Sequence, residues 1–160
     1  MKKIGTIEND YHIYQKSPKT FLIQFEVGGH TISLEDFKYC EWMSEETNCF
    51  RATLVIDGKN IGEAYNEGHG GNAYYHCLDG KTTEETQSHY ALVRDVSRLI
   101  EEVEDYCFPK HKRSLCDVLD GLAAHILTFQ ENNVATIVKA KALIKYIQER
   151  ADMYRERYGN

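Results

Sequence analysis

The stretch from Phe50 to Asn66 constrains the fold of this chain more than any other. Apolar side chains recur at every second position over residues 50–56, and Asp57-Gly58 follows immediately. A period of two places one apolar row on one face of a β-strand. Asp-Gly between two strand-like runs favours a two-residue hairpin turn, because both turn positions need positive φ. The chain is therefore predicted to contain antiparallel strands over about 50–56 and 60–66.

Further strands are predicted on both sides of this hairpin. Residues 20–27 alternate in the same way, and Gly28-Gly29 predicts a second hairpin turn with a return over 30–34. Residues 35–42 are expected to continue that strand after a bulge, and residues 73–78 to form one more short strand. Residues 1–19 are polar and predict irregular structure, with a short edge strand over 11–15.

The apolar spacing changes from two to three or four after residue 80, which is typical of helices. Thr82 and Glu85 have the spacing of a capping box, so a first helix is predicted to begin there and to end at Pro109. Ser114 is predicted to cap a second helix. Asn132-Asn133 should end this second helix and cap a third.

The third helix carries a narrow apolar seam between Ile137 and Tyr154, with successive steps of three and four residues. Such a seam is typical of coiled-coil packing. It predicts either packing inside the molecule against the first two helices or a homodimer formed through the helix near Ile137–Tyr154.

Strands followed by helices predict an α+β fold. We expect an N-terminal antiparallel β-sheet of four to six strands, built from hairpins, with three α-helices packed on one face or end. The chain has 160 residues, which suits a single domain, with 1–80 as the sheet half and 81–160 as the helical half.

Charge and composition narrow the function classes. The formal net charge is −6, and residues 1–80 carry seven basic and twelve acidic side chains. An acidic half disfavours direct nucleic-acid binding, which relies on Lys and Arg, and favours a partner protein with a basic surface. Five cysteines without a CxxC motif indicate reduced thiols in a cytoplasmic protein. No apolar run predicts a membrane span, and the N-terminus does not read as a secretory signal.

Two loops next to the central hairpin combine acidic, glycine and aromatic residues. Glu45-Glu46 lies in the first loop, and Gly68-His69-Gly70-Gly71 lies in the second. Tyrosine and tryptophan near these loops suit recognition, because each offers a large contact area with a polar end. The residues predicted to bind a partner or ligand are Trp42, Glu45, Glu46, Asn66, His69, Gly70, Gly71, Asn72 and Tyr74.

Chemical alternatives for the same loops are open. The glycines could form a nest of backbone N–H groups for a small anionic ligand, although the Lys-Ser/Thr of a phosphate-binding loop is missing. Glu45 or Glu46 could pair with His69 or His76 for general acid–base hydrolysis. No histidines or cysteines have the spacing of a zinc site, and no catalytic residue, metal or cofactor is predicted.

A string within residues 37–76 resembles a pattern found in small uncharacterised proteins of bacteriophages and mobile elements. The residues that carry the resemblance are Ser44-Glu45-Glu46-Thr47, Phe50, Ala52, Leu54, Asp57-Gly58-Lys59, Gly62, Asn66, Gly68, Gly70-Gly71 and Tyr75. The resemblance implies an accessory protein of phage or plasmid type in the cytoplasm of a bacterial host cell. Small acidic proteins in that setting often inhibit host defence systems.

The expected function is therefore a non-enzymatic binding protein of phage or mobile-element type, an inhibitor that occupies a host protein. Two other functions stay open. One is the sequestration of a small phosphorylated ligand or nucleotide by the Gly-rich loop, and the other is a small His/Glu hydrolase.

Overall fold

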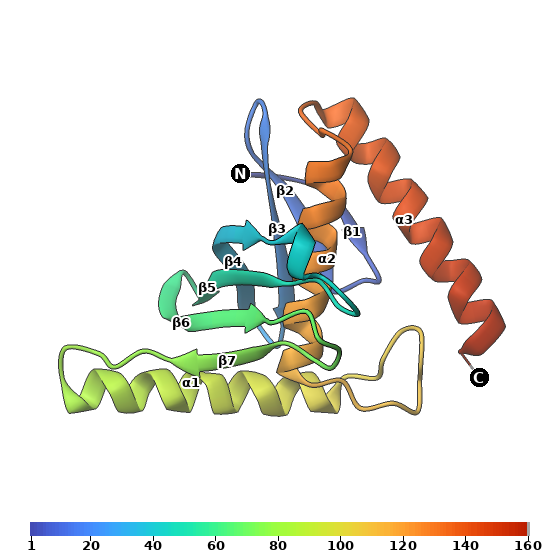
Figure 1. The fold of residues 1–160 in the computed structure, drawn as a ribbon. Helices are drawn as coiled ribbons and strands as arrows, with labels where there is room; N and C mark the ends of the chain where they lie inside the picture. The colour runs from blue at the N-terminus through green and yellow to red at the C-terminus, as the bar shows by residue number, and fades with distance from the viewer. Residues whose placement is uncertain (160) are drawn as a thin grey trace.

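The computed structural model describes residues 1–159 and has one antiparallel β-sheet followed by three α-helices (Figure 1). The seven strands lie side by side in chain order, so every neighbouring pair is a hairpin or a short meander connection. The α+β prediction is confirmed, although seven strands exceed the four to six expected. The strands are β1 Lys2–Ile7, β2 Tyr11–Ser17, β3 Thr20–Val27, β4 His30–Tyr39, β5 Phe50–Ile56, β6 Lys59–Asn66 and β7 Tyr74–Cys77.

The extra strand is β1, a segment that was predicted to be irregular. Its polar residues hide the alternation, since only Ile4 and Ile7 are large and apolar. The segment forms a strand because it pairs with β2. Ile7 lies opposite Tyr11, and both side chains are buried. Cross-strand pairing thus stabilises a segment whose own sequence pattern is weak.

Both predicted hairpin turns are confirmed. Asp57 and Gly58 have φ of 53° and 77°, and Gly28 and Gly29 have φ of 54° and 82°. The Asp57 side chain also accepts a hydrogen bond from the Thr31 N–H at 2.9 Å, which joins the two hairpins at the same end of the sheet.

The predicted bulge in β4 lies at Asp36, where φ is 51° and the register with β5 shifts. The prediction that the strand continues to residue 42 is wrong. The strand ends at Tyr39, because Glu41–Met43 forms a 3-10 turn, labelled η1. The turn redirects the chain and places Trp42 outside the sheet.

The three helices are α1 Thr83–Glu102, α2 Leu115–Glu131 and α3 Ile137–Tyr158. Thr82 and Ser114 cap the first two, as predicted. Two boundaries differ. Helix α1 ends at Glu102, well before Pro109, and the cap of α3 is Thr136, because Asn133 has a left-handed φ of 49° that closes α2.

Helix α2 lies across the sheet and contacts β3 and β4, while α1 runs near β7 and α3 packs against β1 (Figure 1). The core forms between α2 and the strands. Its fully buried side chains include Phe25, Ile32, Leu54, Val118, Leu119 and Leu122. None of the helices in residues 1–159 is long and apolar enough to cross a membrane.

The α3 seam packs inside the molecule, and its main partner is β1 instead of the first two helices. Ala140 and Ile144 are buried, and the Ile144 side chain lies against Gly5, which leaves it room because glycine has no Cβ. Tyr154 at the other end of the seam is 46% exposed. A homodimer through this helix stays a prediction, and it would have to use the exposed end of the seam.

Candidate functional site

The two loops singled out in the sequence meet at one end of the sheet. The β4–β5 loop spans residues 40–49, and the β6–β7 loop spans residues 67–73. The Gly68 carbonyl oxygen accepts hydrogen bonds from the backbone N–H groups of Glu45 at 3.1 Å and Glu46 at 3.0 Å. We call the paired loops and the first residue of β7 the rim, which comprises Trp42, Glu45, Glu46, His69, Gly70, Gly71, Asn72 and Tyr74.

Asn66 lies beneath the rim and is only 3% exposed. Its Oδ1 accepts hydrogen bonds from the Gly68 N–H at 2.8 Å and the Thr47 hydroxyl at 2.9 Å. Its Nδ2 donates to the Gly71 carbonyl at 3.3 Å and to Asp120 Oδ1 at 3.1 Å. Asn66 was predicted to contact a ligand, but its side chain instead holds both loops from inside.

Asp120, on α2, is the residue that sequence reasoning missed. Its Oδ2 accepts a hydrogen bond from the Ala73 N–H at 2.7 Å, so one carboxylate joins the helix to both ends of the β6–β7 loop. Burial raises the pKa of Asp120, while the Ala73 and Asn66 hydrogen bonds act in the opposite direction. The one available signal was an acidic side chain within the apolar run of residues 118–127.

Two glycines of the β6–β7 loop, Gly68 and Gly70, adopt positive φ and lie close to the β4–β5 loop. Gly70 has φ of 94°, and a Cβ there would lie 2.5 Å from Glu46 Oε2. Gly68 has φ of 86°, and a Cβ there would collide with the Met43 carbonyl oxygen. The Gly68 N–H bonds Asn66, and the Gly70 N–H bonds Thr47 Oγ1 at 3.3 Å. These two donors of the expected anion nest therefore already have partners within the protein.

The other rim side chains face solvent. Trp42 is 83% exposed and Tyr74 is 59% exposed. Glu45 Oε2 lies 3.4 Å from His69 Nδ1, and both side chains are more than half exposed. Glu46 and Asn72 are also exposed, and Gly70 is half-buried. The rim therefore exposes aromatic and acidic side chains on loops that are hydrogen-bonded to the buried Asn66 side chain.

The expected acid–base pair is only partly assembled. His69 and Glu45 meet, but both side chains are more than half exposed, so water has free access to the pair. His76 lies on β7 opposite Glu63, with its ring 6.2 Å from Tyr65. Within residues 1–159, no group of three or more His, Cys, Asp or Glu side chains is placed to hold a metal ion.

A band of aromatic and charged residues continues from the rim across the outer face of the sheet. The Tyr65 and Tyr74 rings lie 5.9 Å apart, and the Arg51 guanidinium is 5.7 Å from the Tyr65 ring. Arg51 Nη1 also pairs with Glu63 Oε1 at 2.9 Å. These contacts extend the exposed surface next to Tyr74.

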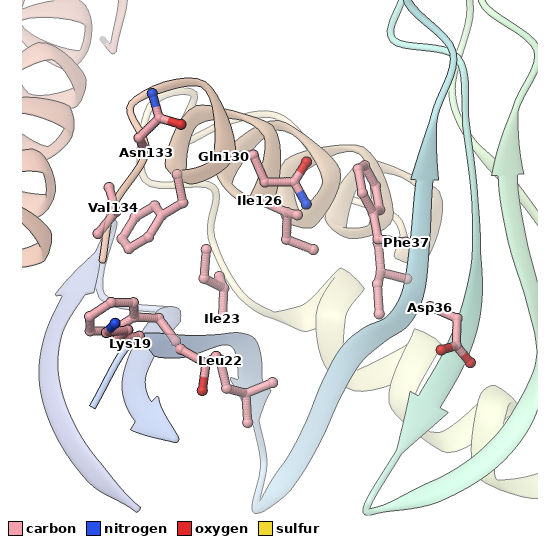
Figure 2. Close-up of a pocket in the computed structure, with 13 residues that line it drawn as sticks. Lys19, Leu22, Ile23, Asp36, Phe37, Ile126, Gln130, Asn133 and Val134 are labelled. Carbon is pink, nitrogen blue, oxygen red and sulfur yellow. The ribbon is translucent and has the colours of Figure 1, made fainter. Parts of the chain in front are cut away.

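A separate apolar pocket of about 410 Å³ lies between β3, β4 and the end of α2. Figure 2 shows Ile23, Phe37 and Ile126 lining it, with the Gln130 amide at its margin. No rim residue lines this pocket. No sequence pattern indicates this pocket, because its walls come from segments that are about a hundred residues apart.

Comparison with protein-family models, with curated proteins and with solved structures finds no match to this chain. The rim combines the features predicted from sequence with an exposed and internally braced geometry. It is the strongest candidate surface in the described part of the chain.

Proposed function

We propose that this chain is a non-enzymatic binding protein that docks a partner protein with a basic surface through the rim. The observation that carries the proposal is Trp42, which is 83% exposed at the end of a braced pair of loops. Tryptophan is enriched among the residues that dominate binding energy at protein interfaces. A large aromatic side chain in water on a fixed backbone is suited to insertion into a partner.

The charge of the rim supports a basic partner. Glu45 and Glu46 are exposed beside Trp42, and the same two loops carry the exposed Glu41 and Glu67. Acidic groups around an aromatic anchor attract a basic surface over long range and accelerate encounter at low salt. His69 lies against Glu45 and is the only basic side chain in the two loops.

The bracing beneath the rim supports binding without rearrangement. Asn66 and Asp120 fix the β6–β7 loop, and the Gly68 carbonyl fixes the β4–β5 loop on it. Loops that are ordered before binding lose little conformational entropy in the complex. The affinity then depends on the exposed side chains and not on folding of the loops.

The proposal extends to the biological setting implied by the phage-like string of residues 37–76. The protein is proposed to act in the cytoplasm of a bacterial host cell as an inhibitor of a defence system, by occupying one of its proteins. Inhibition by occupation needs an exposed and charged surface on a backbone that is ordered before binding. The exposed glutamates and the hydrogen-bonded loops of the rim support this role.

The test is capture of a host protein by the tagged chain from bacterial lysate, identification of that protein, and measurement of Kd with the purified pair. The rim variant combines Trp42→Ala, Glu45→Ala and Glu46→Ala. A matched control on α3 combines Tyr146→Ala, Glu149→Ala and Glu156→Ala, which are also exposed. We expect the rim variant to bind about 100-fold more weakly, which corresponds to the loss of one aromatic hot spot.

The control variant is expected to bind within about twofold of the wild type. A rim variant with unchanged Kd would rule out this surface. A thermal-shift panel of nucleotides and phosphorylated metabolites tests the alternative ligand class, and stabilisation that is lost in Gly71→Ala would favour the Gly-rich loop as an anion site.

A further inference from the structure

Strand β7 ends the sheet, and its outer edge has no strand partner among residues 1–159. The Leu78 N–H donates to the Ile61 carbonyl at 2.9 Å, and the register places His76 opposite Glu63. In an antiparallel ladder, hydrogen-bonded and non-hydrogen-bonded pairs alternate. His76 therefore bonds β6, while the N–H and C=O groups of Tyr75 and Cys77 point outward.

A groove runs between this free edge and α1. It has a volume of about 780 Å³, with Tyr75 and Cys77 on the strand side and Tyr90, Arg94 and Arg98 among the residues on the helix side. Peptides that add a strand to an exposed sheet edge obtain affinity from main-chain hydrogen bonds and specificity from contacts of alternate side chains. The β7–α1 groove provides both elements.

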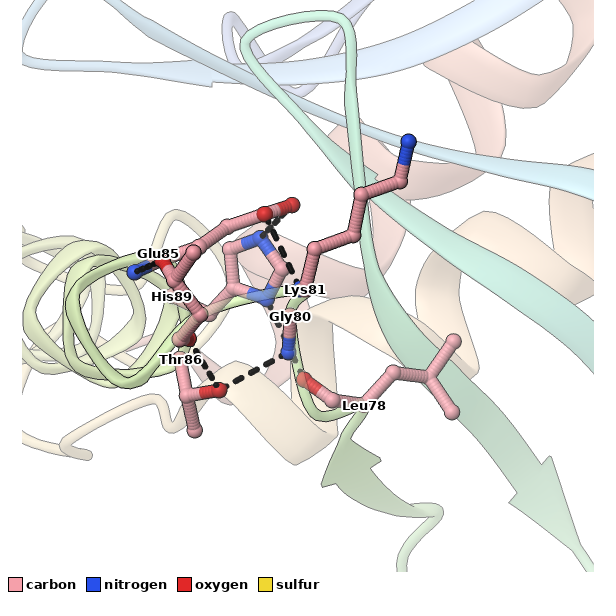
Figure 3. Close-up of polar contacts among 7 residues, drawn as sticks. Leu78, Gly80, Lys81, Glu85, Thr86 and His89 are labelled. Atoms are coloured by element: carbon pink, nitrogen blue, oxygen red, sulfur yellow. Dashed lines mark hydrogen bonds and ion pairs between the residues drawn. The ribbon is translucent and has the colours of Figure 1, made fainter.

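The position of α1 relative to β7 is fixed by polar contacts at the start of the helix (Figure 3). The Gly80 N–H donates to Thr86 Oγ1 at 2.8 Å, and His89 Nδ1 lies 3.1 Å from the Leu78 carbonyl oxygen. These contacts join the end of β7 to the first turns of α1. The groove is therefore a built feature and not a gap beside a loosely attached helix.

The helix wall carries two cationic groups, Arg94 and Arg98, together with one carboxylate, Glu101. Arg94 and Arg98 are exposed one turn apart, and the arginine ion pairs in the described residues engage Arg51 and Arg113 instead. Residues four apart on a helix are separated by about 6 Å along its axis, and alternate residues of a strand by about 6.6 Å. Carboxylates at alternate positions of an extended peptide therefore match the spacing of the two guanidinium groups.

We propose that β7 and α1 form a docking groove for an extended acidic peptide segment of a partner protein, which adds to the sheet as an eighth strand. Its main chain bonds the outward groups of Tyr75 and Cys77. Its acidic side chains at alternate positions pair with Arg94 and Arg98. This site is distinct from the rim and does not depend on the function proposed for the rim.

The test uses a synthetic library of nine-residue peptides with Glu or Asp at positions 4 and 6 and varied residues elsewhere, with binding measured by fluorescence polarisation. We expect selected peptides to bind with salt-dependent affinity and to lose at least about tenfold in Arg94→Glu/Arg98→Glu. The matched control Arg150→Glu/Arg157→Glu reverses two exposed charges on α3 and should leave Kd unchanged. Trp42→Ala should also leave Kd unchanged, which separates this site from the rim.

Backbone methylation of the best peptide tests strand addition directly. Because only every second residue of an added strand bonds β7, N-methyl groups should abolish binding at alternate positions and be tolerated between them. Amide exchange at Tyr75 and Cys77 should slow in the complex. A library without binders, an equal loss in the α3 control, or methylation effects without a period of two would overturn the proposal.

Discussion

The two edge strands of the sheet, β1 and β7, differ in how well they are protected from pairing with another chain. Edge β1 carries Lys2 and Lys3, has a register shift before Gly5, and is packed against α3. Lysines, bulges and covering helices are the usual means by which proteins protect a sheet edge from pairing with another chain. Edge β7 has neither lysine nor proline nor a register shift, and a groove separates it from α1. This difference leaves the β7 edge open for the peptide that we propose, whereas the β1 edge is closed by α3.

A buried polar cluster lies towards each edge of the sheet, and the two clusters differ in chemistry. At the β1 end, Arg113 is 5% exposed, and its Nη2 bonds Asp10 Oδ2 at 2.8 Å. At the β7 end, the neutral amide of Asn66 joins the loops to Asp120. The first cluster is an ion pair that ties the β1–β2 turn to the start of α2. The second is a hydrogen-bond network that leaves the side chains above it free.

The Cys107 thiol lies near the β1 edge, where it is partly buried and bonds the Glu8 carboxylate. Burial, followed by the nearby Glu8 carboxylate, raises the pKa of Cys107 to about 12. The thiolate is the nucleophilic form of cysteine, and a raised pKa lowers the fraction of Cys107 in that form at neutral pH. All five cysteines are free in the structure, as the odd count and the absence of CxxC predicted.

The largest effect is expected from breaking the ion pair at the closed end. Asp10→Ala should lower the free energy of unfolding by about 3 kcal/mol, because it leaves the buried Arg113 charge without its partner. Urea denaturation measures this loss. Adding Arg113→Met should recover most of it, since an apolar side chain of similar length needs no counter-charge. No recovery in the double variant would show that the pair contributes through its geometry and not through its charge.

A smaller loss is expected from the network at the open end. Asn66→Ala should cost about 2 kcal/mol, because it leaves several buried donors and acceptors without partners. The exposed Asn72 in the same loop provides the control, and Asn72→Ala should change stability by less than about 0.5 kcal/mol. Amide exchange at Gly68 should also accelerate in Asn66→Ala. Equal costs for the two variants would contradict the role assigned to Asn66.

The pH dependence of stability should be similar at the two ends. Burial raises the pKa of Glu8 above its ordinary value of 4.5 and that of Asp120 above 3.8. The folded state then holds each proton more tightly than the unfolded chain. The stability due to each group is therefore complete below the ordinary pKa and is lost as pH rises through the raised pKa. Glu8→Gln and Asp120→Asn should each flatten the fall in stability as pH rises from about 4 towards neutrality.

Urea titrations at successive pH values check this expectation. Glu35→Gln, at an exposed position on β4, is the control and should leave the pH profile unchanged. A wild-type stability that rises with pH across the same window, and does so less in the two variants, would show that the sign is wrong.

The smallest effect on stability is expected at Trp42. Trp42→Ala should change the free energy of unfolding by less than about 0.5 kcal/mol, because the side chain is already in water. The same variant should lose partner binding at the rim, and Trp42→Phe should retain part of it. A large loss of stability would show that Trp42 serves the fold instead of a partner.

Local sequence patterns predicted the parts of this fold that depend on neighbouring residues. The Gly28-Gly29 and Asp57-Gly58 turns were predicted because few residues tolerate positive φ, and the Thr82 and Ser114 caps because their side chains bond N–H groups three residues ahead. The predicted end of α1 was wrong, because Pro109 marks only the latest residue at which the helix must stop. The rim residues were predicted as candidates from their composition alone.

The sequence by itself determined the α+β order, both tight turns, the starts of the first two helices and the acidic, aromatic character of two loops. These follow from backbone sterics, hydrogen bonds and side-chain periods that act over a few residues. Tertiary structure alone decided that β1 joins the sheet, that Asp120 reaches the β6–β7 loop and that α1 borders a free edge at β7. Each of these depends on residues that are distant in the chain, and no local pattern records which distant groups will meet.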